Sequence, residues 1–376
     1  MKFLAFILFI SFIFLSGKHV LAQVSNTGLM DTTSGLKIGN VSLGVYMDVY
    51  YAFNFNQPIS GENNYFVSSN QHNSFQLNLG YLDLKFTDKR VRARFIPAFG
   101  TYMNSNYTYE KGAMKFILEG NIGVKLFEKR EIWLDVGVLG SPYTNESAIS
   151  KDHLMYSRSF SAENVPYYLS GIKMTFPLNE KMTFYGYLLN GWQQIYDQNK
   201  QKSIGTQLEI RPNKSNLFNW DVYLGNEKSP LNPTYGMRYF SDVYWIFERG
   251  KWKVTSCAYA GIQRYEEIPE QEASKFWWQA NLIGRRQIKE NWSVSGRVEY
   301  FNDAQNALIP VQTATYTNNS FKCLSSGLSL AYKFSEKCLF RIEARYLKAA
   351  NSAFEKSNGM RVSNELQVFS NLSIWF

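Results

Sequence analysis

The sequence predicts an all-β protein, a transmembrane antiparallel up-and-down β-barrel of about sixteen strands, with about fourteen as the alternative. Three observations lead to this prediction. Apolar and polar residues alternate along most of the chain, short polar turns alternate with long loops, and the last strand ends on Trp375 and Phe376. A sheet rolled up in a bilayer has these properties, because its outer face meets lipid and its rims favour aromatic rings.

Composition agrees with a membrane protein built from strands. The 376 residues are 16% aromatic, with 25 Tyr and 28 Phe, and the mean hydropathy is -0.30. This hydropathy excludes a helical membrane protein but suits a barrel, whose alternating strands average to a polar value. After the first segment, no apolar run approaches the ~18 residues of a spanning helix. The rest of the chain therefore either is soluble outside the cytoplasm or crosses a membrane as strands.

The N-terminal segment has the features of an export signal. Lys2 is followed by an apolar run and by small residues that end at Ala22. We therefore predict a signal peptide over residues 1–22, a short periplasmic segment over 23–40 and an outer-membrane β-barrel over 41–376.

Charge and cysteine content exclude two classes of partner. The formal charge is +9, but Lys and Arg are scattered along the chain, which argues against nucleic acid. We expect the excess to concern small anions or lipopolysaccharide. Cys257, Cys323 and Cys338 lack metal-ligand spacing and are expected to be small packing residues.

The strands are predicted in order from residue 41. The first, residues 41–54, places apolar side chains on one face: Val41, Leu43, Val45, Met47, Val49, Tyr51 and Phe53. The next are predicted at 73–87, 91–102, 114–127, 132–141, 167–177 and 182–191. The last strand has Leu366, Val368, Leu372, Ile374 and Phe376 on one face and Gln367, Asn371 and Ser373 on the other.

The connections between strands are of two kinds. The short polar turns are residues 88–90, 128–131, 178–181, 212–216, 248–251, 288–291 and 335–337. The longer segments lie near 56–72, 103–113, 142–166, 192–202, 226–233, 265–274, 304–320 and 349–361. Short turns at one rim and long loops at the other are typical of an outer-membrane barrel.

Two further patterns bear on this fold. In strand 73–87 the apolar residues change from one face to the other near Tyr81, which indicates either a bulge or a wrongly predicted strand. The alternative of fourteen strands depends on the second of these explanations. Tryptophans lie near the predicted strand ends, and we expect them to form girdles at the two rims. They are Trp133, Trp192, Trp245, Trp252, Trp277, Trp278, Trp292 and Trp375.

Charged residues within the strands predict the inner face. In strand 338–348, a slip of one residue would turn Arg341, Glu343 and Arg345 toward lipid, at roughly 2–4 kcal/mol for each Arg near the midplane. The same rule sends Asp48 and Glu209 inward. The predicted pore-lining residues are Arg92, Arg94, Lys115, Glu119, Lys125, Lys173, Arg211, Arg238, Arg297, Glu299, Arg341, Glu343 and Arg345. They would line a hydrated pore with a weak anion preference, or neutralise one another along the wall.

The long loops raise three further hypotheses. Loop 142–166 either folds into the lumen as a constriction or projects outward. Within it, His153 with Ser157 or Ser159 is the one set that would suit a lipid hydrolase. Glu266, Glu267, Glu270 and Glu272 form a solvated acidic loop or, less readily, a cation site. We expect no cofactor, no metal and no enzymatic activity.

Several short motifs resemble one known family. They are Met47–Pro58 (MDVYYAFNFNQP), Phe75–Leu79 (FQLNL), Gly140–Glu146 (GSPYTNE), Tyr156–Ser159 (YSRS) and Leu189–Gln193 (LNGWQ). Together they resemble the OmpL-like β-barrel porin family over most of the chain. The resemblance implies an outer-membrane porin without catalytic residues. It also implies that Phe376 is the carboxy-terminal aromatic through which the barrel-assembly machinery recognises its clients.

The expected function is a water-filled channel for passive diffusion of small hydrophilic solutes with a weak anion preference. The expected partners of the protein are outer-membrane lipid and lipopolysaccharide. Other classes stay open: a plugged or structural barrel that acts as an adhesin or anchor without conductance, an outer-membrane lipid hydrolase, and a soluble extracellular β-protein. The sequence leaves the solute, the pore size and the oligomeric state open.

Overall fold

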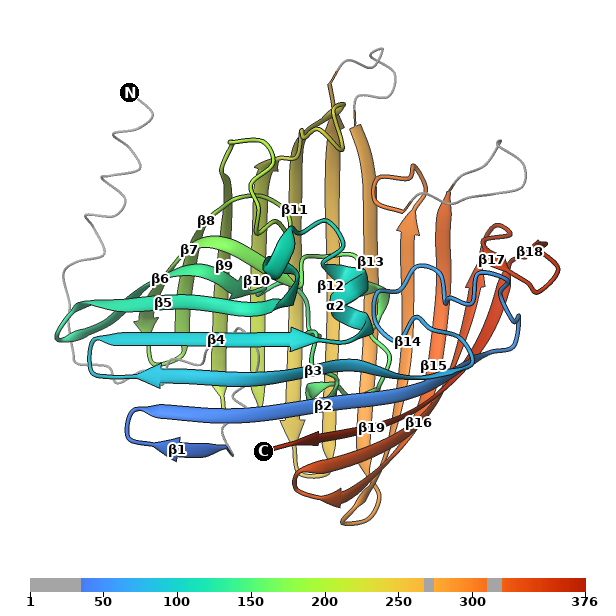
Figure 1. Cartoon of the computed structure of the whole chain (residues 1–376), viewed down its shortest axis with the longest axis horizontal. Coiled ribbons are helices and arrows are strands. Elements are labelled where there is room, and N and C mark those ends of the chain that lie inside the picture. The colour runs from blue at the N-terminus through green and yellow to red at the C-terminus, as the bar shows by residue number, and fades with distance from the viewer. Residues whose placement is uncertain (1–34, 267–273, 310–319) are drawn as a thin grey trace.

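The computed structural model describes residues 35–266, 274–309 and 320–376, and in these residues sixteen antiparallel strands form a closed barrel (Figure 1). Each strand pairs with the next along the chain, and the last strand, β19, pairs with β2 to close the ring. The strands are β2 (Val41–Asn54), β3 (Ser74–Thr87), β4 (Val91–Phe99), β5 (Ile117–Phe127), β6 (Arg130–Gly140), β7 (Tyr168–Asn179), β8 (Met182–Leu189), β9 (Ser203–Asn213), β10 (Asn216–Asn226), β11 (Tyr235–Arg249), β12 (Trp252–Tyr265), β13 (Ser274–Gln287), β14 (Trp292–Asp303), β15 (Phe321–Ser335), β16 (Cys338–Ala349) and β19 (Asn364–Trp375). The predicted fold class and strand number are confirmed.

Smaller elements lie at the two ends of the barrel. At the short-turn end, β1 (Leu36–Ile38) pairs with the start of β2. In the long loops are α2 (Thr101–Asn106), the 3₁₀ helices η1 (Gly112–Phe116) and η2 (Ser150–Asp152), α3 (Phe160–Glu163) and the hairpin of β17 (Phe354–Glu355) and β18 (Arg361–Val362). Among the described residues, no helix is both long and apolar enough to cross a bilayer.

Some predictions lie outside the described residues. These are the signal peptide over 1–22, most of the segment over 23–40, and the acidic residues Glu267, Glu270 and Glu272.

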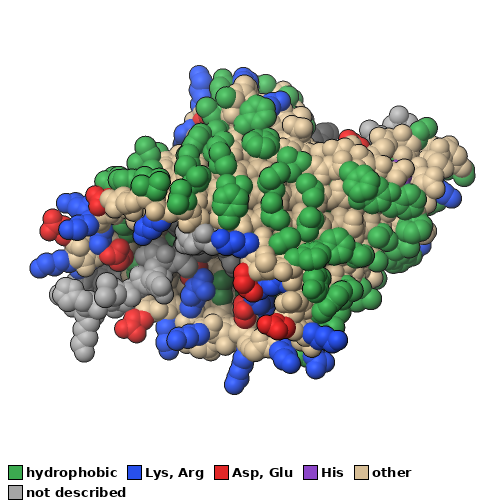
Figure 2. All heavy atoms as spheres, turned by 60° about the horizontal axis from the view of Figure 1, so that its bottom comes forward, with side chains coloured by type: hydrophobic (Ala, Val, Ile, Leu, Met, Phe, Trp, Pro, Cys, Tyr) green, Lys and Arg blue, Asp and Glu red, His purple; other side chains and the backbone are tan. Residues whose placement is uncertain are grey.

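Strand alternation sorts side chains as the sequence predicts. In β16, Arg341, Glu343 and Arg345 are buried inside, whereas Ile342 is 47% exposed and Tyr346 44% exposed on the outer face. The last strand alternates in the same way, with Leu366, Leu372 and Ile374 exposed and Gln367, Asn371 and Ser373 buried. Figure 2 shows hydrophobic side chains over the outer wall and charged side chains gathered at the end of the barrel.

The phase change in the second strand is a bulge. Asp48 pairs with Leu79 and Val49 with Leu77, so the β2–β3 register skips Asn78. Asn78 is buried inside the barrel and its Nδ2 donates to Oδ2 of Asp48 at 2.9 Å. Leu79 and Tyr81 are buried as well. The strand therefore exists, and its phase changes at Asn78 rather than at Tyr81.

Two strand boundaries were predicted wrongly. The strand predicted at 91–102 ends at Phe99, because residues 101–106 form α2. The strand predicted at 114–127 begins at Ile117, because residues 112–116 form η1. This second difference places Lys115, a predicted pore-lining residue, in a 3₁₀ helix outside the strand.

The tryptophan girdle was predicted correctly only in part. Trp252 and Trp292 are exposed on the outer face near the short-turn end. Trp133 and Trp277 are buried inside the barrel, and Trp192 packs against the inner aromatic cluster. The prediction rested on how close each Trp lies to the end of its strand. Whether a Trp faces lipid or the lumen depends instead on the alternation of side chains between the two faces of the strand.

Candidate functional site in the barrel lumen

The connection between β6 and β7, residues 141–167, lies inside the barrel and is called loop 3 below. Tyr156, Ser159 and Phe160 are buried, and their hydrogen bonds and ring contacts reach strands on the far side of the ring. Of the two alternatives for this loop, the structure therefore has the inward one. A loop in the lumen must have its backbone polar groups satisfied there, because unpaired buried groups are costly.

Carboxylates on β14 and β16 accept N–H groups of loop 3. Oε2 of Glu343 accepts the backbone N–H of Tyr156 at 2.6 Å and that of Ser157 at 3.2 Å. Oε2 of Glu299 accepts the backbone N–H of Phe160 at 2.6 Å. Both glutamates are buried. These two predicted pore-lining residues thus hold the middle of the loop.

Guanidinium groups of the same wall donate to the loop's carbonyls. Nη1 of Arg341 donates to the carbonyl of Ser150 at 2.7 Å, and Nη1 of Arg297 to that of Ser157 at 2.6 Å. Nη1 of Arg345 reaches a further loop carbonyl, that of Arg158, at 3.0 Å. Hydrogen bonds with one ionised partner are roughly twice as strong as neutral ones. The loop is therefore held by both signs of charge on one wall.

The charges of this wall also pair with one another. Arg297 lies 3.2 Å from Glu299 and 3.5 Å from Glu343, and Arg345 lies 2.7 Å from Glu299. The arginines and glutamates thus neutralise one another while they bind the loop.

The wall opposite carries a second set of ion pairs. Nε and Nη2 of Arg92 bind both carboxylate oxygens of Asp135, at 2.7 and 2.6 Å. Arg94 lies 2.7 Å from Asp83 and 3.3 Å from Glu119. This set has the mutually neutralising arrangement that was the alternative to a free charged wall.

The remaining predicted pore-lining residues lie in several surroundings. Lys173 is 3.7 Å from Asp135 on the neighbouring strand, and Lys125 forms an ion pair with Glu131. Arg211 is exposed near the short-turn end and lies 2.8 Å from Glu209. Arg238 is buried near the long-loop end.

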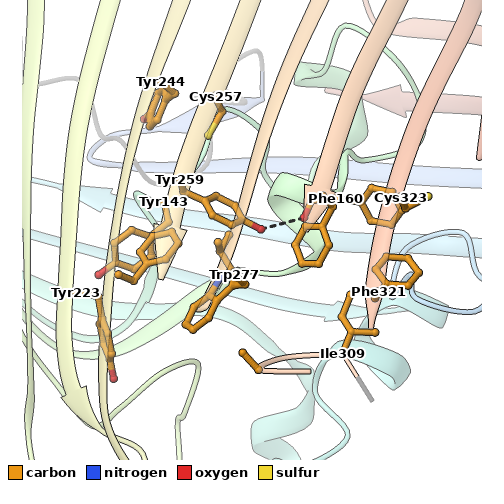
Figure 3. Close-up of a cluster of buried hydrophobic side chains, with 14 of the residues drawn as sticks. Tyr143, Phe160, Tyr223, Tyr244, Cys257, Tyr259, Trp277, Ile309, Phe321 and Cys323 are labelled. Atoms are coloured by element: carbon orange, nitrogen blue, oxygen red, sulfur yellow. Dashed lines mark hydrogen bonds between the residues drawn. The ribbon is translucent and has the colours of Figure 1, made fainter. Parts of the chain in front are cut away.

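Arg238 belongs to an aromatic cluster that was not predicted. Its Nε donates to Oε1 of Gln263 at 2.8 Å, and its guanidinium lies 4.9 Å from the ring centre of Trp192. Inward side chains from the long-loop halves of many strands pack together here with three residues of loop 3, Tyr143, Phe160 and Val165, and Figure 3 shows part of this cluster. They include Tyr143, Phe160, Tyr223, Phe240, Tyr259, Trp277, Phe301 and Phe321.

Loop 3 contributes directly to this packing. The ring of Phe160 lies 5.6 Å from that of Phe321, and the hydroxyl of Tyr259 donates to the carbonyl of Phe160 at 3.4 Å (Figure 3). A second cluster surrounds α2, where the rings of Tyr107 and Tyr168 stack at 4.2 Å. Side chains and loops therefore fill the long-loop half of the lumen. The sequence could have shown this cluster, because its aromatic residues occupy positions of the strands that alternate toward the lumen.

The short-turn half of the lumen contains a cavity of about 1550 Å³. Its lining combines loop 3 with the short-turn ends of the strands, and cations outnumber anions in it. The basic lining residues are Lys37, Lys85, Arg94, Lys151, Lys181, Arg211, Lys214, Lys253 and Arg285, and the acidic ones are Asp83, Glu146, Asp152, Glu180 and Glu248. We call this cavity the vestibule.

Contacts within loop 3 and with its neighbours fix its shape. Oε2 of Glu146 accepts the backbone N–H of Ser159 at 2.8 Å. Oε2 of Glu163 accepts the backbone N–H of Val67, in the loop after β2, at 2.7 Å. Burial raises the pKa of Glu163 to about 7.

Among the described residues, no hydrogen bond joins His153 to Ser157 or Ser159, the set that would suit a lipid hydrolase. The hydroxyl of Ser157 binds Glu343 and that of Ser159 binds Glu146. Nε2 of His153 accepts the backbone N–H of Ser147 at 2.9 Å, and burial, with the neighbouring arginines, lowers the pKa of His153 well below its usual value. Each side chain thus has a structural partner.

The outer acidic residue Glu266 lies 3.1 Å from Lys228. In the described part of the chain, no three His, Cys, Asp or Glu side chains are placed to hold a metal ion.

Comparison with known proteins identifies relatives of the sequence and of the fold. A family model described as "Putative beta-barrel porin-2, OmpL-like" matches residues 40–374. A comparison with curated proteins gives no match.

Solved structures with the same fold share little sequence. OmpT, an outer membrane protein of Vibrio cholerae, is 11% identical with a TM-score of 0.57, over 91% of this chain and 100% of that one. An anion-selective porin from Comamonas acidovorans is 8% identical with a TM-score of 0.57, over 89% and 99% of the two chains. OprB of Pseudomonas putida is 9% identical with a TM-score of 0.56, over 90% and 94%.

Proposed function

The chain belongs to the OmpL-like family of β-barrel porins, and from this membership we propose that it is an outer-membrane channel for passive diffusion of small hydrophilic solutes with a weak preference for anions. The short-turn end then faces the periplasm and the long loops face outward. The proposal assigns no chemical step to the protein: solutes are selected by the width of the lumen and by the charges fixed on its wall.

The vestibule is the observation that supports the anion preference. Most charged groups of the opposite wall are paired, as Arg92 is with Asp135. The vestibule lining has more cations than anions, and Lys181 and Lys214 lie in its short turns. A concave surface of one sign concentrates counter-ions and raises their rate of entry. Anions are therefore enriched at the periplasmic entrance.

Loop 3 and the aromatic clusters determine the conductance in this proposal. Between the vestibule and the outside, the lumen is filled by loop 3, α2 and inward aromatic residues. A solute passes only when some of these contacts open. We therefore expect small, fluctuating single-channel currents rather than the steady current of a wide pore.

Planar-bilayer recording tests the proposal. Purified full-length protein should give channel steps, and the zero-current potential in a KCl gradient should favour chloride. Replacing Lys181 and Lys214 by Gln should reduce that preference, because both residues add positive charge to the lining of the vestibule. A cation preference that survives Glu119→Gln, Glu299→Gln and Glu343→Gln would contradict the proposed polarity.

The filled outer half of the lumen favours a second candidate, a plugged barrel with a structural or adhesive role. The two candidates differ in one measurement. If the intact protein gives no steps and a variant that lacks residues 144–162 conducts steadily, the barrel is a plugged one. Steps from the intact protein support the channel.

The last strand is the element we propose for recognition during assembly. Phe376 is 47% exposed at the end of β19, and its backbone exchanges two hydrogen bonds with Val45, at 3.0 and 2.8 Å. Its ring is therefore displayed on the outer face at the seam of the barrel, where assembly machinery could contact it before the ring closes.

A further inference from the structure

Two lysines face outward near the long-loop ends of the neighbouring strands β15 and β16. Cys323 and Leu347, next to them in sequence, are buried on the inner face, so Lys322 and Lys348 point to the outer surface. Leu324 pairs with Lys348, which makes the two lysines diagonal neighbours across the strand pair. Such positions have Cα atoms about 7–8 Å apart, within joint reach of one small group.

Along the described part of the strand surface, these lysines have no carboxylate beside them. Nζ of Lys348 donates to the hydroxyl of Ser363 at 2.8 Å, a neutral partner. Within the described residues, the outward positions of β13 to β16 and β19 include no Asp or Glu. Their immediate outward neighbours at this end are the amides Asn302, which pairs with Lys322, and Asn364, which pairs with Lys348. The patch therefore carries an unbalanced positive charge.

Aromatic rings place this patch at the edge of the bilayer. Trp278 pairs with Asn302, and its ring lies 5.3 Å from that of Tyr300 on the outer face. Tyr346 is exposed two residues before Lys348. Trp and Tyr collect at the level of lipid headgroups. The lysines follow these rings toward the long loops, while exposed Leu324 and Leu328 continue the apolar surface in the other direction.

We propose that Lys322 and Lys348 bind a phosphate group of a phosphorylated glycolipid in the outer leaflet, whose acyl chains lie along the leucines below. Two ammonium groups that converge on one phosphate make charge-assisted hydrogen bonds, and the amides of Asn302 and Asn364 can donate to the sugar. The inference rests on the outer-membrane location in the proposed function. It names a partner for the outer wall and does not involve the lumen.

Retention of a defined lipid tests the site. Full-length protein in detergent is mixed with diphosphoryl lipid A, with the same lipid lacking phosphates, or with inorganic phosphate, and the bound molecules are counted by native mass spectrometry. We expect the intact protein to retain diphosphoryl lipid A about tenfold better than the K322Q/K348Q variant, since each lysine near an anionic headgroup adds to the attraction. The phosphate-free lipid should bind both proteins equally weakly.

A matched control separates the site from total charge. K289Q/K337Q removes two exposed lysines from the opposite rim, and it should retain lipid as the intact protein does. K322R/K348R keeps both charges and should retain it too. Folding is checked by heat-modifiable electrophoretic mobility; if the double variant does not fold, K322Q and K348Q singly should each show a partial loss.

Three results would overturn the inference: equal retention by K322Q/K348Q and the intact protein, an equal loss in K289Q/K337Q, or full displacement of the lipid by equimolar inorganic phosphate. Conductance recorded on the same samples keeps the two proposals apart. K322Q/K348Q should conduct as the intact protein does. Lipid retention by a protein without conductance would contradict the channel and leave this site standing.

Discussion

At the scale of single residues, two carboxyl groups of the inner wall face each other, and no Lys or Arg of the described residues forms an ion pair with either. Asp221 on β10 pairs in register with Asp242 on β11. Asp221 is 0% exposed, and neither of its carboxylate oxygens has a hydrogen-bond partner in the part of the chain that the structure describes. Burying such a group costs free energy, because its hydration is lost without replacement. This pair destabilises the wall.

We predict that Asp221→Asn raises the thermal stability of the barrel in detergent, because the amide removes the repulsion between the two carboxylates and is cheaper to bury. The gain in free energy of unfolding should be about 1–3 kcal/mol. Asp48→Asn is the matched control and should lower stability. Asp48 is equally buried, but its oxygens accept from Asn78 at 2.9 Å and Asn371 at 2.6 Å. The thermal unfolding midpoints of the two variants and the intact protein are measured by circular dichroism. A lower midpoint for Asp221→Asn than for the intact protein would contradict this account.

At the scale of elements, strands and loops differ in how far the sequence predicts them. The strands were predictable because most of them follow a local period of two. In β16 the charges of Arg341, Glu343 and Arg345 also decide which face of the strand points into the lumen. The course of loop 3 was not predictable, because its partners are remote. The N–H of Phe160 is bound by Glu299 and that of Tyr156 by Glu343. The sequence of the loop has no repeating pattern that predicts contacts with distant strands. The sequence therefore predicted Glu299 and Glu343 only as pore-lining residues.

The anchoring of loop 3 leads to a prediction for the whole loop. Glu299→Gln with Glu343→Gln should loosen it, because two ionised acceptors are lost and Arg297 and Arg345 keep uncompensated charge. Breaking buried ion pairs typically costs about 3–5 kcal/mol. Limited proteolysis should then cut within residues 141–167 at least tenfold faster, while the strands stay protected. Lys333→Gln, which removes one half of an exposed pair with Glu336, should leave the rate unchanged. Unchanged cleavage in the double variant would show that the aromatic contacts alone hold the loop.

At the scale of the whole molecule, the ring closes between segments that are farthest apart in sequence. Asn371 of β19 pairs with Tyr50 of β2, whereas the other strand pairs join neighbours along the chain. Loop-closure entropy must be overcome before so distant a contact contributes, so closure should come late in folding. The order of strands therefore assigns β2 and β19 a kinetic role that no local pattern shows.

We predict that Phe376→Ala slows the last phase of refolding into micelles severalfold, because Phe376 lies at this seam, where its backbone binds Val45. Phe334→Ala is the matched control: Phe334 is an exposed aromatic near the same end of the barrel, at 63% exposure, but it lies on β15, between two sequence neighbours. Phe334→Ala should change the free energy of unfolding by about as much as Phe376→Ala does, but it should not change the rate of the last refolding phase. Time courses of heat-modifiable mobility measure both. Equal slowing in the two variants would mean that exposed aromatic area, rather than the seam, sets the rate, and closure would then not be the late step.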